Sequence, residues 1–439
     1  MITAIHLHNF KSFAGDWHRI PLGPLTLMVG TNASGKSNVR DALRFLHGTA
    51  RSYLLSEILG EKYGEGGGLE WKGIRGGARE AVFGANGGEF LIGCDVKHTT
   101  HIRAKTADRL VPREWSFRYS MTLKVNARRK TAIVSDEELY AGNKAIFSTK
   151  KLVLKAVQSE DGKQILVRYS KQGQRKFIGP TIKLRCDQPL VSQLLDHPDV
   201  SASTRTACRA FLNGLESMRF LDLDPQALRR PSLPGQVILG DKGDNLSSVL
   251  QALCEDPVRR EAFVEWTKEL TPLDVEELRF DPVSLDGKIQ LALEESGGRI
   301  ITAESASDGT LRFLAYAAAL LGTKPAATYV FEEIENGIHP NRVHLLLELL
   351  QQATEKGTTQ VIATTHSPAL LNFLRGKALE NALLVTRHGP SSRVRCLKDL
   401  PMADDDKIVA GDLLESGWFE NITAFLNAEE SEAEEETEP

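Results

Sequence analysis

A glycine-bracketed lysine stands near the start of the chain, in the segment GTNASGKS at residues 30–37. The segment fits the pattern G-x-x-x-x-G-K-[ST] of a phosphate-binding loop, whose backbone amides curl around phosphate oxygens. We expect Lys36 to place its charge beside the β- and γ-phosphates and Ser37 to offer its hydroxyl to Mg²⁺. The predicted nucleotide-binding residues of this loop are Gly30, Asn32, Gly35, Lys36, Ser37 and Asn38.

A phosphate loop needs a strand before it and a helix after it, and the flanking sequence predicts both. LTLMVG is apolar and β-like, whereas KSNVRDALRFLHG repeats apolar residues at helical spacing, with Gly48 as the expected helix end. The context therefore favours a nucleotide site over a simple glycine turn.

A pair of carboxylates forms the second candidate, where the mostly apolar run TYVF ends in Glu332 and Glu333. Hydrolysis of a nucleotide triphosphate needs a carboxylate near the metal and a group that orients and deprotonates the attacking water. We expect Glu332 to serve as a Mg²⁺ ligand and Glu333 as the base. The alternative, a solvated strand end, is disfavoured by the apolar run before the pair and by ENGIHP after it.

Four segments occur in a fixed order: the phosphate loop, SASDGTLRF, VFEEIENGIHP and IATTHS. This ordered set resembles the ATPase head of the ABC superfamily, in the soluble branch that contains RecF, the SMC proteins and the OLD-family ATPases. The resemblance covers about the first ninety and the last hundred and forty residues. It implies an α/β P-loop NTPase of ABC-ATPase head type, a mixed sheet flanked by helices with a β-rich and helical insertion, and it implies ATP and Mg²⁺ as ligands.

The resemblance also assigns roles to residues at matching positions. Ser307, Asp308 and Gly309, between Ala306 and Thr310, occupy the signature motif at the start of a helix, which in relatives faces the γ-phosphate bound by the other protomer. His366 matches the switch histidine that contacts the γ-phosphate; the alternative is a structural hydrogen bond. The segment that resembles the D-loop, which couples the protomers, contains Asn336, Gly337 and His339.

Two positions depart from the family pattern. Glu332 stands where the family usually has an aspartate, and its side chain is one methylene longer. No glutamine between residues 70 and 100 matches the Q-loop, so that contact stays unassigned.

The implied domains are an N-terminal part of the head at 1–99, an insertion at 100–275, a C-terminal part of the head at 276–427 and a disordered acidic tail at 428–439. Strand-like alternation runs from FLIGCDV through WSFRYSMTLKV and KLVLKAV to ILVRYS. The insertion is basic between residues 103 and 130, which indicates either a solvated face, the favoured interpretation, or a surface for nucleic acid or a partner. Its cationic residues there are Arg103, Lys105, Arg109, Arg113, Arg118, Lys124, Arg128, Arg129 and Lys130.

Composition bounds the class of protein. With 41% hydrophobic and 26% charged residues the chain is globular, and its apolar runs are too short to span a bilayer, so we expect a cytoplasmic protein. The five cysteines show no paired spacing, which predicts neither a disulfide framework nor a zinc site. The segments MRFLDLDP and GDNLSSVLQAL resemble compact bacterial ATPases of this branch but receive no chemical role, since Leu246, Val249 and Leu250 have the spacing of core residues.

Four functions are candidates for a chain with these motifs. The first is an ATP-dependent switch in which two or more identical chains close on ATP and control a separate effector, a nuclease or a toxin, as in bacterial anti-phage systems. We expect no TOPRIM nuclease domain after IATTHS, because only about seventy residues follow it in this sequence. The second is a RecF- or SMC-like repair ATPase that binds nucleic acid. A transporter ATPase would carry an LSGGQ motif and a Q-loop glutamine, and a small-molecule kinase would need neither a signature nor a switch histidine.

Overall fold

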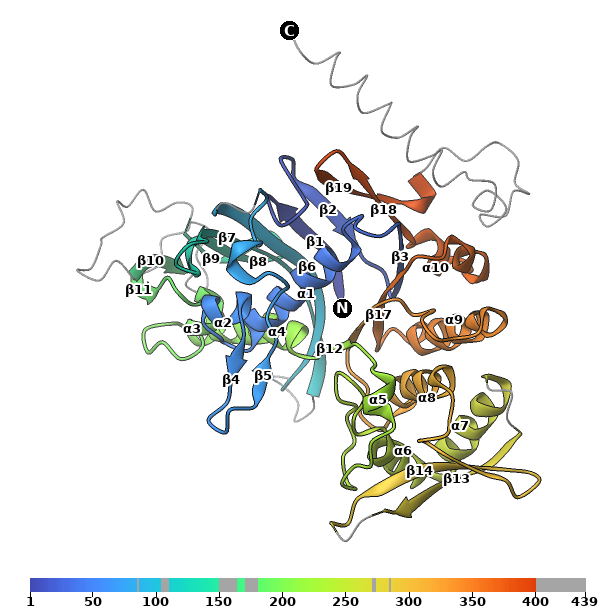
Figure 1. Ribbon diagram of the computed structural model, residues 1–439. Coiled ribbons are helices and arrows are strands. Elements are labelled where there is room, and N and C mark those ends of the chain that lie inside the picture. The colour runs from blue at the N-terminus through green and yellow to red at the C-terminus, as the bar shows by residue number, and fades with distance from the viewer. Residues whose placement is uncertain are drawn as a thin grey trace. The chain divides into compact units, whose positions relative to one another are not determined.

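The computed structural model describes residues 1–84, 87–103, 110–149, 164–169, 181–270, 274–283 and 286–399 (Figure 1). The chain separates into two compact units, each assembled from segments that are distant in sequence. Unit 1 consists of Met1–Gly23, Asn32–Ser217 and Val385–Arg395. Unit 2 consists of Pro24–Thr31, Met218–Leu384 and the chain from Cys396 onward.

Unit 1 is built on an eight-stranded antiparallel sheet in the order β11-β10-β9-β8-β7-β6-β1-β2. Along β7, Trp115, Phe117 and Tyr119 are buried while the residues between them are more exposed, which is the period of two expected for a half-buried strand. The strands are β1 (Ile2–His8), β2 (His18–Pro21), β6 (Gly88–Arg103), β7 (Leu110–Asn126), β8 (Thr131–Ala141), β9 (Lys144–Ser148), β10 (Gln164–Tyr169) and β11 (Thr181–Arg185).

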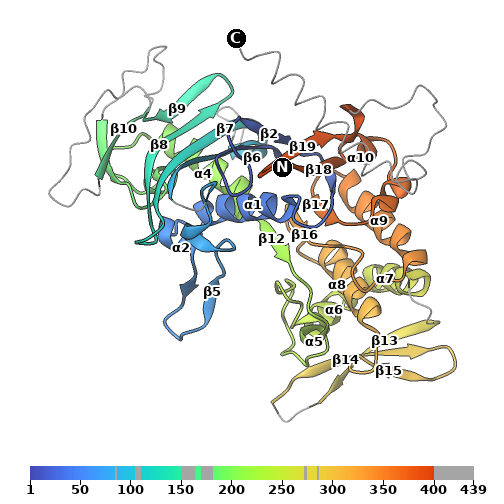
Figure 2. The ribbon, with the colours of Figure 1, turned by 45° about the horizontal axis from the view of Figure 1, so that its top comes forward.

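Helix α4 (Ala202–Glu216) covers the buried face of this sheet (Figure 2). Its Phe211 ring lies 5.7 Å from the ring of Phe117 and 4.8 Å from that of Tyr119, centroid to centroid, so aromatic packing joins helix and sheet. The predicted strand KLVLKAV lies outside the described residues. The other small elements of unit 1 are α2 (Leu55–Leu59), β4 (Lys62–Tyr63), β5 (Leu69–Trp71), η1 (Gly77–Arg79) and α3 (Leu190–Gln193).

Helix α1 (Lys36–Ala50) follows the phosphate loop, as predicted, but it continues through Gly48. The expected helix end at this glycine is therefore wrong. A Cβ atom at position 48 would lie 2.9 Å from Ile58 Cγ2 and 3.0 Å from the Trp71 ring. Gly48 thus serves close packing against α2 and β5 rather than helix termination, which spacing along the chain cannot reveal.

Unit 2 contains a parallel sheet in the order β12-β16-β17-β3. Every residue of β16, β17 and β3 is buried, which is typical of parallel strands covered on both faces. Strand β18 (Leu383–His388) joins the sheet through Leu383 and Leu384, which pair with β3, and it leads into unit 1, where β19 (Ser391–Cys396) follows. The parallel strands are β12 (Met218–Leu221), β16 (Thr328–Phe331), β17 (Gln360–Thr365) and β3 (Leu25–Val29).

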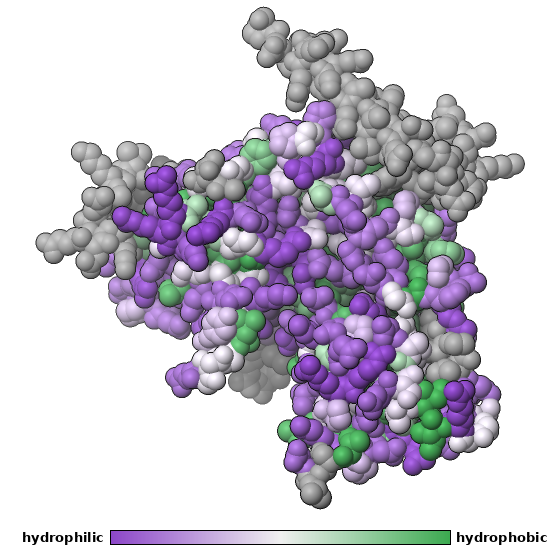
Figure 3. Space-filling view, viewed as in Figure 1, coloured by the Kyte–Doolittle hydropathy of each residue, from purple (hydrophilic) through white to green (hydrophobic). Residues whose placement is uncertain are grey.

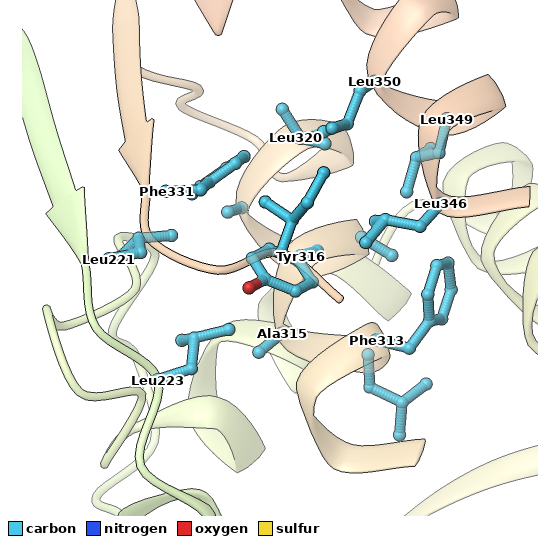
Figure 4. Packing of buried hydrophobic residues seen from close by; sticks show 14 of the residues in the cluster. Leu221, Leu223, Phe313, Ala315, Tyr316, Leu320, Phe331, Leu346, Leu349 and Leu350 are labelled. Atoms are coloured by element: carbon cyan, nitrogen blue, oxygen red, sulfur yellow. The ribbon is translucent and has the colours of Figure 1, made fainter. Parts of the chain in front are cut away.

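Helix α8 (Asp308–Leu321) lies at the centre of the unit 2 core. Tyr316 of α8 meets Phe331 of β16 edge to face with ring centroids 5.0 Å apart, and Leu346, Leu349 and Leu350 of α9 lie on another side of the helix (Figure 4). The further elements are α5 (Pro225–Leu228), α6 (Leu246–Cys254), α7 (Pro257–Leu270), α9 (Pro340–Glu355), η2 (Pro368–Phe373), α10 (Lys377–Glu380) and η3 (Leu397–Asp399), and a small antiparallel sheet of β13 (Val275–Pro282), β14 (Ile289–Glu295) and β15 (Ile300–Thr302).

The expected α/β class with mixed sheets is confirmed, and the insertion is β-rich and then helical. The expected boundary at 99/100 falls inside β6 and that at 275/276 inside β13, so neither coincides with a division between the units. The acidic tail lies outside the described residues. Polar residues cover most of the face seen in Figure 3, with apolar residues in scattered spots. Within the described ranges, no helix combines the length and apolar character that a membrane span requires.

Candidate nucleotide site

The candidate chemistry gathers at one edge of the parallel sheet in unit 2. Phe331 of β16 pairs with Ala363 of β17, and Thr365 of β17 pairs with Val29 of β3. The residues that follow these three strands are Glu332, His366 and Gly30. Carboxyl ends of neighbouring parallel strands form the edge where α/β proteins bind ligands. The sheet therefore brings the carboxylate pair, the histidine and the start of the phosphate loop to the same edge.

The phosphate loop has a backbone suited to an anion. Ala33 and Gly35 adopt positive φ values of 62° and 117°, and such left-handed residues fold successive amides into a concave nest. The carbonyl oxygen of Ser34 accepts a hydrogen bond from Ser392 Oγ at 2.6 Å, and that of Ala33 accepts one from Arg387 at 3.4 Å. The carbonyl oxygens of Ala33 and Ser34 are therefore bonded to other residues of unit 1.

Helix α1 starts directly after this loop without a side-chain cap and without an acidic residue in its first turn. An uncapped N-terminus offers amide donors and a partial positive charge to a phosphate. Lys36 is 5% exposed. The Asn38 side chain donates to Ser12 Oγ at 2.6 Å and accepts from Arg75 at 3.3 Å, so its amide is committed to neighbours within unit 1. The loop and helix fit a nucleotide phosphate, and the individual ligand roles stay predictions.

The side chain and the amide of Glu333 make three contacts. Its Oε1 lies 2.6 Å from Nε2 of His366, its Oε2 accepts a hydrogen bond of 2.6 Å from Asn336, and its amide donates to Thr364 Oγ1 at 3.0 Å. Glu333 also has a φ of 47°, a conformation rare outside glycine, and such strain is concentrated at functional sites. The structure thus joins two predicted catalytic residues, Glu333 and His366, and adds Asn336 from the predicted D-loop.

Sequence reasoning missed Glu335. One of its oxygens, Oε1, accepts from the backbone amide of His366 at 2.7 Å and from the Thr365 hydroxyl at 2.7 Å. Its Oε2 is buried without a hydrogen-bond partner among the described residues. Glu335 therefore fixes the backbone that carries His366. The one feature of the sequence that could have pointed to Glu335 is its position two residues after Glu333. Its contact with His366 spans thirty-one residues and cannot be predicted from spacing along the chain.

The signature residues lie at the start of α8, as expected. Ser307 is the N-cap, and its hydroxyl accepts from the Thr310 amide at 3.1 Å. A Cβ atom on Gly309 would come within 2.2 Å of the Gly337 carbonyl, so the signature and the predicted D-loop touch through two glycines of one chain. His339 of the D-loop caps α9 by accepting from the Asn341 amide at 3.3 Å.

The basic stretch is split in the structure. Arg128, Arg129 and Lys130 are exposed in the turn between β7 and β8, whereas Arg113 lies 3.8 Å above the Trp115 ring and Arg118 lies 3.6 Å from Asp95. Lys105 and Arg109 lie outside the described residues. Arg113, Arg118 and Lys124 are exposed on β7 as well, so the exposed cations extend from the strand into the turn.

Comparison with known proteins gives a family match in two segments. The family described as AAA domain, putative AbiEii toxin, Type IV TA system, matches residues 25–87 and 237–372, which include the phosphate loop, the signature, the carboxylate pair and His366. The chromosome condensation protein dpy-27 of Caenorhabditis elegans is 40% identical over 74 residues, which are 16% of this chain and 5% of that protein.

Among solved structures, an SMC head bound to the C-winged helix domain of ScpA aligns with a TM-score of 0.45 at 15% identity, covering 90% of this chain and 97% of that one. The SMC head domain from Thermotoga maritima gives a TM-score of 0.40 at 15% identity, with 90% and 98% covered. The family match includes the strand, loop and helix at residues 25–50, which is the arrangement of the phosphate-binding loop in a P-loop NTPase.

Proposed function

We propose that the chain is a Mg²⁺-dependent ATPase that works as a homodimer or larger homo-oligomer and switches a separate effector protein. The contact of 2.6 Å between Glu333 and His366, at the sheet edge where the phosphate loop begins, carries this proposal. An acid and a histidine paired beside a phosphate loop suit hydrolysis of the terminal phosphate.

Glu333 acts as the base in this proposal. Both of its carboxylate oxygens are engaged, one by His366 and one by Asn336. For Glu333 to take a proton from water, one oxygen must exchange its present partner for that water. His366 is then available to the γ-phosphate, and Glu335 keeps its backbone in place. Hydrolysis that requires such an exchange is expected to be slow.

ATP and Mg²⁺ fit the residues present. The uncapped start of α1 and the left-handed loop suit the phosphates, with Lys36 beside them. Ser37 and Glu332 would hold the Mg²⁺, which neutralises phosphate charge when bound. P-loop enzymes bind this ion through few protein ligands and the phosphates themselves, so no dense cluster of acidic residues is needed.

The switch closes when ATP is shared between chains, and the signature of one chain meets the phosphates bound by the other. Ser307 at the N-cap of a fourteen-residue helix supports this role, because helix N-termini attract phosphate. The description of the matched family names a putative toxin of a type IV TA system. In this proposal the effector is a separate nuclease or toxin, and the pair acts in bacterial defence against phage. The location of such a protein is the cytoplasm.

The first test measures ATP binding and hydrolysis by Lys36→Ala, with Lys324→Ala as control because Lys324 is exposed in the turn between α8 and β16. Lys36→Ala is expected to lose nucleotide binding, and the wild type and Lys324→Ala to hydrolyse ATP slowly and only with Mg²⁺. Normal ATP affinity in folded Lys36→Ala would remove the basis of the proposal. The effector is tested by co-purification with the product of the neighbouring gene, with and without ATP.

A second candidate function is an SMC-like ATPase that binds nucleic acid, which the local similarity to a chromosome condensation protein favours. It assigns the turn cations Arg128, Arg129 and Lys130 to phosphate contacts. Reversing these three to glutamate should weaken DNA or RNA binding and reduce its salt dependence, whereas ATPase activity should persist. The matched control reverses three exposed lysines of unit 2, Lys268, Lys324 and Lys356. Equal binding by both triple variants would leave the turn as a solvated face.

A further inference from the structure

Arg229 has no role predicted from the sequence, yet its side chain makes a set of contacts around the signature. It follows α5, and its side chain is 19% exposed. Its guanidinium donates to three carbonyl oxygens, those of Pro225 at 3.0 Å, Glu304 at 3.3 Å and Ala306 at 2.9 Å. The same group bonds Asp308 Oδ1 at 2.6 Å. One arginine therefore joins α5, the loop before the signature and the first residue of α8.

Two of these carbonyls belong to the segment that leads into the N-cap. Ala306 directly precedes Ser307, so the bond from Arg229 to its carbonyl fixes where the N-cap hydroxyl lies. On the other side, Gly309 lies against the Gly337 carbonyl. The N-terminal turn of α8 is thus held between an arginine and a glycine contact, which leaves little freedom to adjust when a ligand arrives.

Arg229 also affects the charge at the start of α8. Asp308 is the first residue of α8, and its side chain is 55% exposed. A carboxylate there favours the helix itself but opposes a phosphate that approaches the same N-terminus. The guanidinium at 2.6 Å balances this charge, since close ion pairs at partly buried positions interact more strongly than at the open surface. The helix N-terminus then keeps its attraction for an anion.

We propose that Arg229 is the positioning residue of the signature: it tethers the loop at Glu304 and Ala306 and neutralises Asp308, so that α8 can receive the phosphates of ATP bound by a second copy of this chain. This inference rests on the proposed function, because it assumes that ATP joins two chains. Arg229 itself touches no reacting atom in this scheme.

The experiment measures ATP-dependent self-association by sedimentation, with hydrolysis blocked by Glu333→Gln in every protein compared. Arg229→Met is expected to weaken association at least tenfold, because it removes a charged hydrogen bond and leaves Asp308 unbalanced. The ATP affinity of the single chain should stay within about twofold of that of the Glu333→Gln protein. The reason is that the signature of one chain contacts the phosphates of ATP bound by the other chain. The matched control is Arg230→Met, whose exposed arginine is the next residue.

Removal of the Asp308 carboxylate distinguishes charge balance from a purely structural role of Arg229, because a purely structural role predicts no recovery of self-association. Asp308→Asn added to Arg229→Met should restore at least threefold of the lost association, because the unbalanced carboxylate is gone. Asp308→Asn alone should associate more strongly than the Glu333→Gln protein, because the carboxylate that opposes the incoming phosphate is removed. It changes an exposed side chain and stays informative even if Arg229→Met does not fold, which thermal unfolding will show.

Three results would overturn the inference: association of Arg229→Met equal to that of Arg230→Met, no recovery in the double variant, or a tenfold loss in Asp308→Asn alone. If the proposed function itself is wrong, the pattern is different: the Glu333→Gln protein does not self-associate even when ATP is present. The two failures can therefore be told apart.

Discussion

At the scale of single residues, the two adjacent glutamates after β16 have different surroundings. Glu333 is bonded to His366 and Asn336, whereas Glu332 directly follows the buried strand. We predict that Glu333→Gln retains ATP but loses about 10²–10⁴-fold in hydrolysis, because the base is removed and the shape is kept. The ATP-bound, associated form should accumulate, as measured by sedimentation with ATP.

Glu332→Gln should instead lower nucleotide affinity and the dependence on Mg²⁺ together, because it removes a charge next to the metal. Glu276→Gln, at an exposed position of β13, is the control for a neutralised glutamate. The assignment fails if Glu333→Gln hydrolyses ATP at the wild-type rate while Glu332→Gln accumulates the associated form; the roles would then be exchanged.

Glu137 is a buried acid of unit 1 that the sequence did not single out. Burial raises its pKa to about 7, although the amides of Leu190 and Val191 and the Tyr119 hydroxyl donate to it and favour the charged form. Between its ordinary pKa and about 7 the folded state holds the proton more tightly than the unfolded state. The contribution of this group to the free energy of unfolding is therefore largest at low pH and falls as pH rises toward 7, by at most about 1.4 kcal/mol per pH unit.

We predict that the free energy of unfolding of wild type minus that of Glu137→Gln decreases between pH 4.5 and about 7 and is constant above, because glutamine does not titrate. Denaturant titrations at several pH values measure it, and Glu114→Gln, exposed on β7, supplies the control. A difference that rises with pH over this window would contradict the raised pKa.

At the scale of elements, the contact of α8 with the D-loop depends on the absence of a side chain at Gly309. A Cβ atom there would collide with the Gly337 carbonyl, which belongs to the backbone and cannot simply rotate away. We predict that Gly309→Ala costs about 1–3 kcal/mol of stability and weakens ATP-dependent association, while the single chain still binds ATP. Nucleotide titration and sedimentation measure the two effects.

The matched control is Gly297→Ala, since nothing lies within 4 Å of a Cβ at that position and its φ is not in the left-handed region. This variant should behave as wild type in both measurements. Equal association by the two alanine variants would show that the glycine contact has no part in closure.

At the scale of the whole molecule, shared sites make a prediction about mixed chains. Lys36→Ala damages the phosphate loop and Ser307→Arg the signature, so each homodimer has two damaged sites. A mixed dimer has one site with both changes and one site with neither. We therefore expect mixing to restore part of the ATPase activity, measured on heterodimers purified with two different tags. Verified heterodimers without activity would argue that each chain completes its own site.

The sequence by itself determined the elements that depend on neighbours along the chain. The phosphate loop precedes α1, Glu332 and Glu333 follow β16, His366 follows β17 and Ser307 caps α8, because strand ends, caps and glycine loops are set by local patterns. The α/β class was implied by the resemblance of the four ordered segments to ATPase heads. The predicted end of α1 at Gly48 was wrong, because a glycine is needed there for close packing and not to end the helix.

Only the tertiary structure decided which side chains meet. Glu335 holds the backbone at His366 from thirty-one residues away, and Arg229 reaches Asp308 across seventy-nine. The two amides that donate to Glu137 come from α3, more than fifty residues later. Such pairs depend on how sheets and helices pack, and spacing along a chain contains no record of it. The burial that raises the pKa of Glu137 exists only once unit 1 has folded. The close packing of Gly309 against Gly337 likewise exists only once unit 2 has folded.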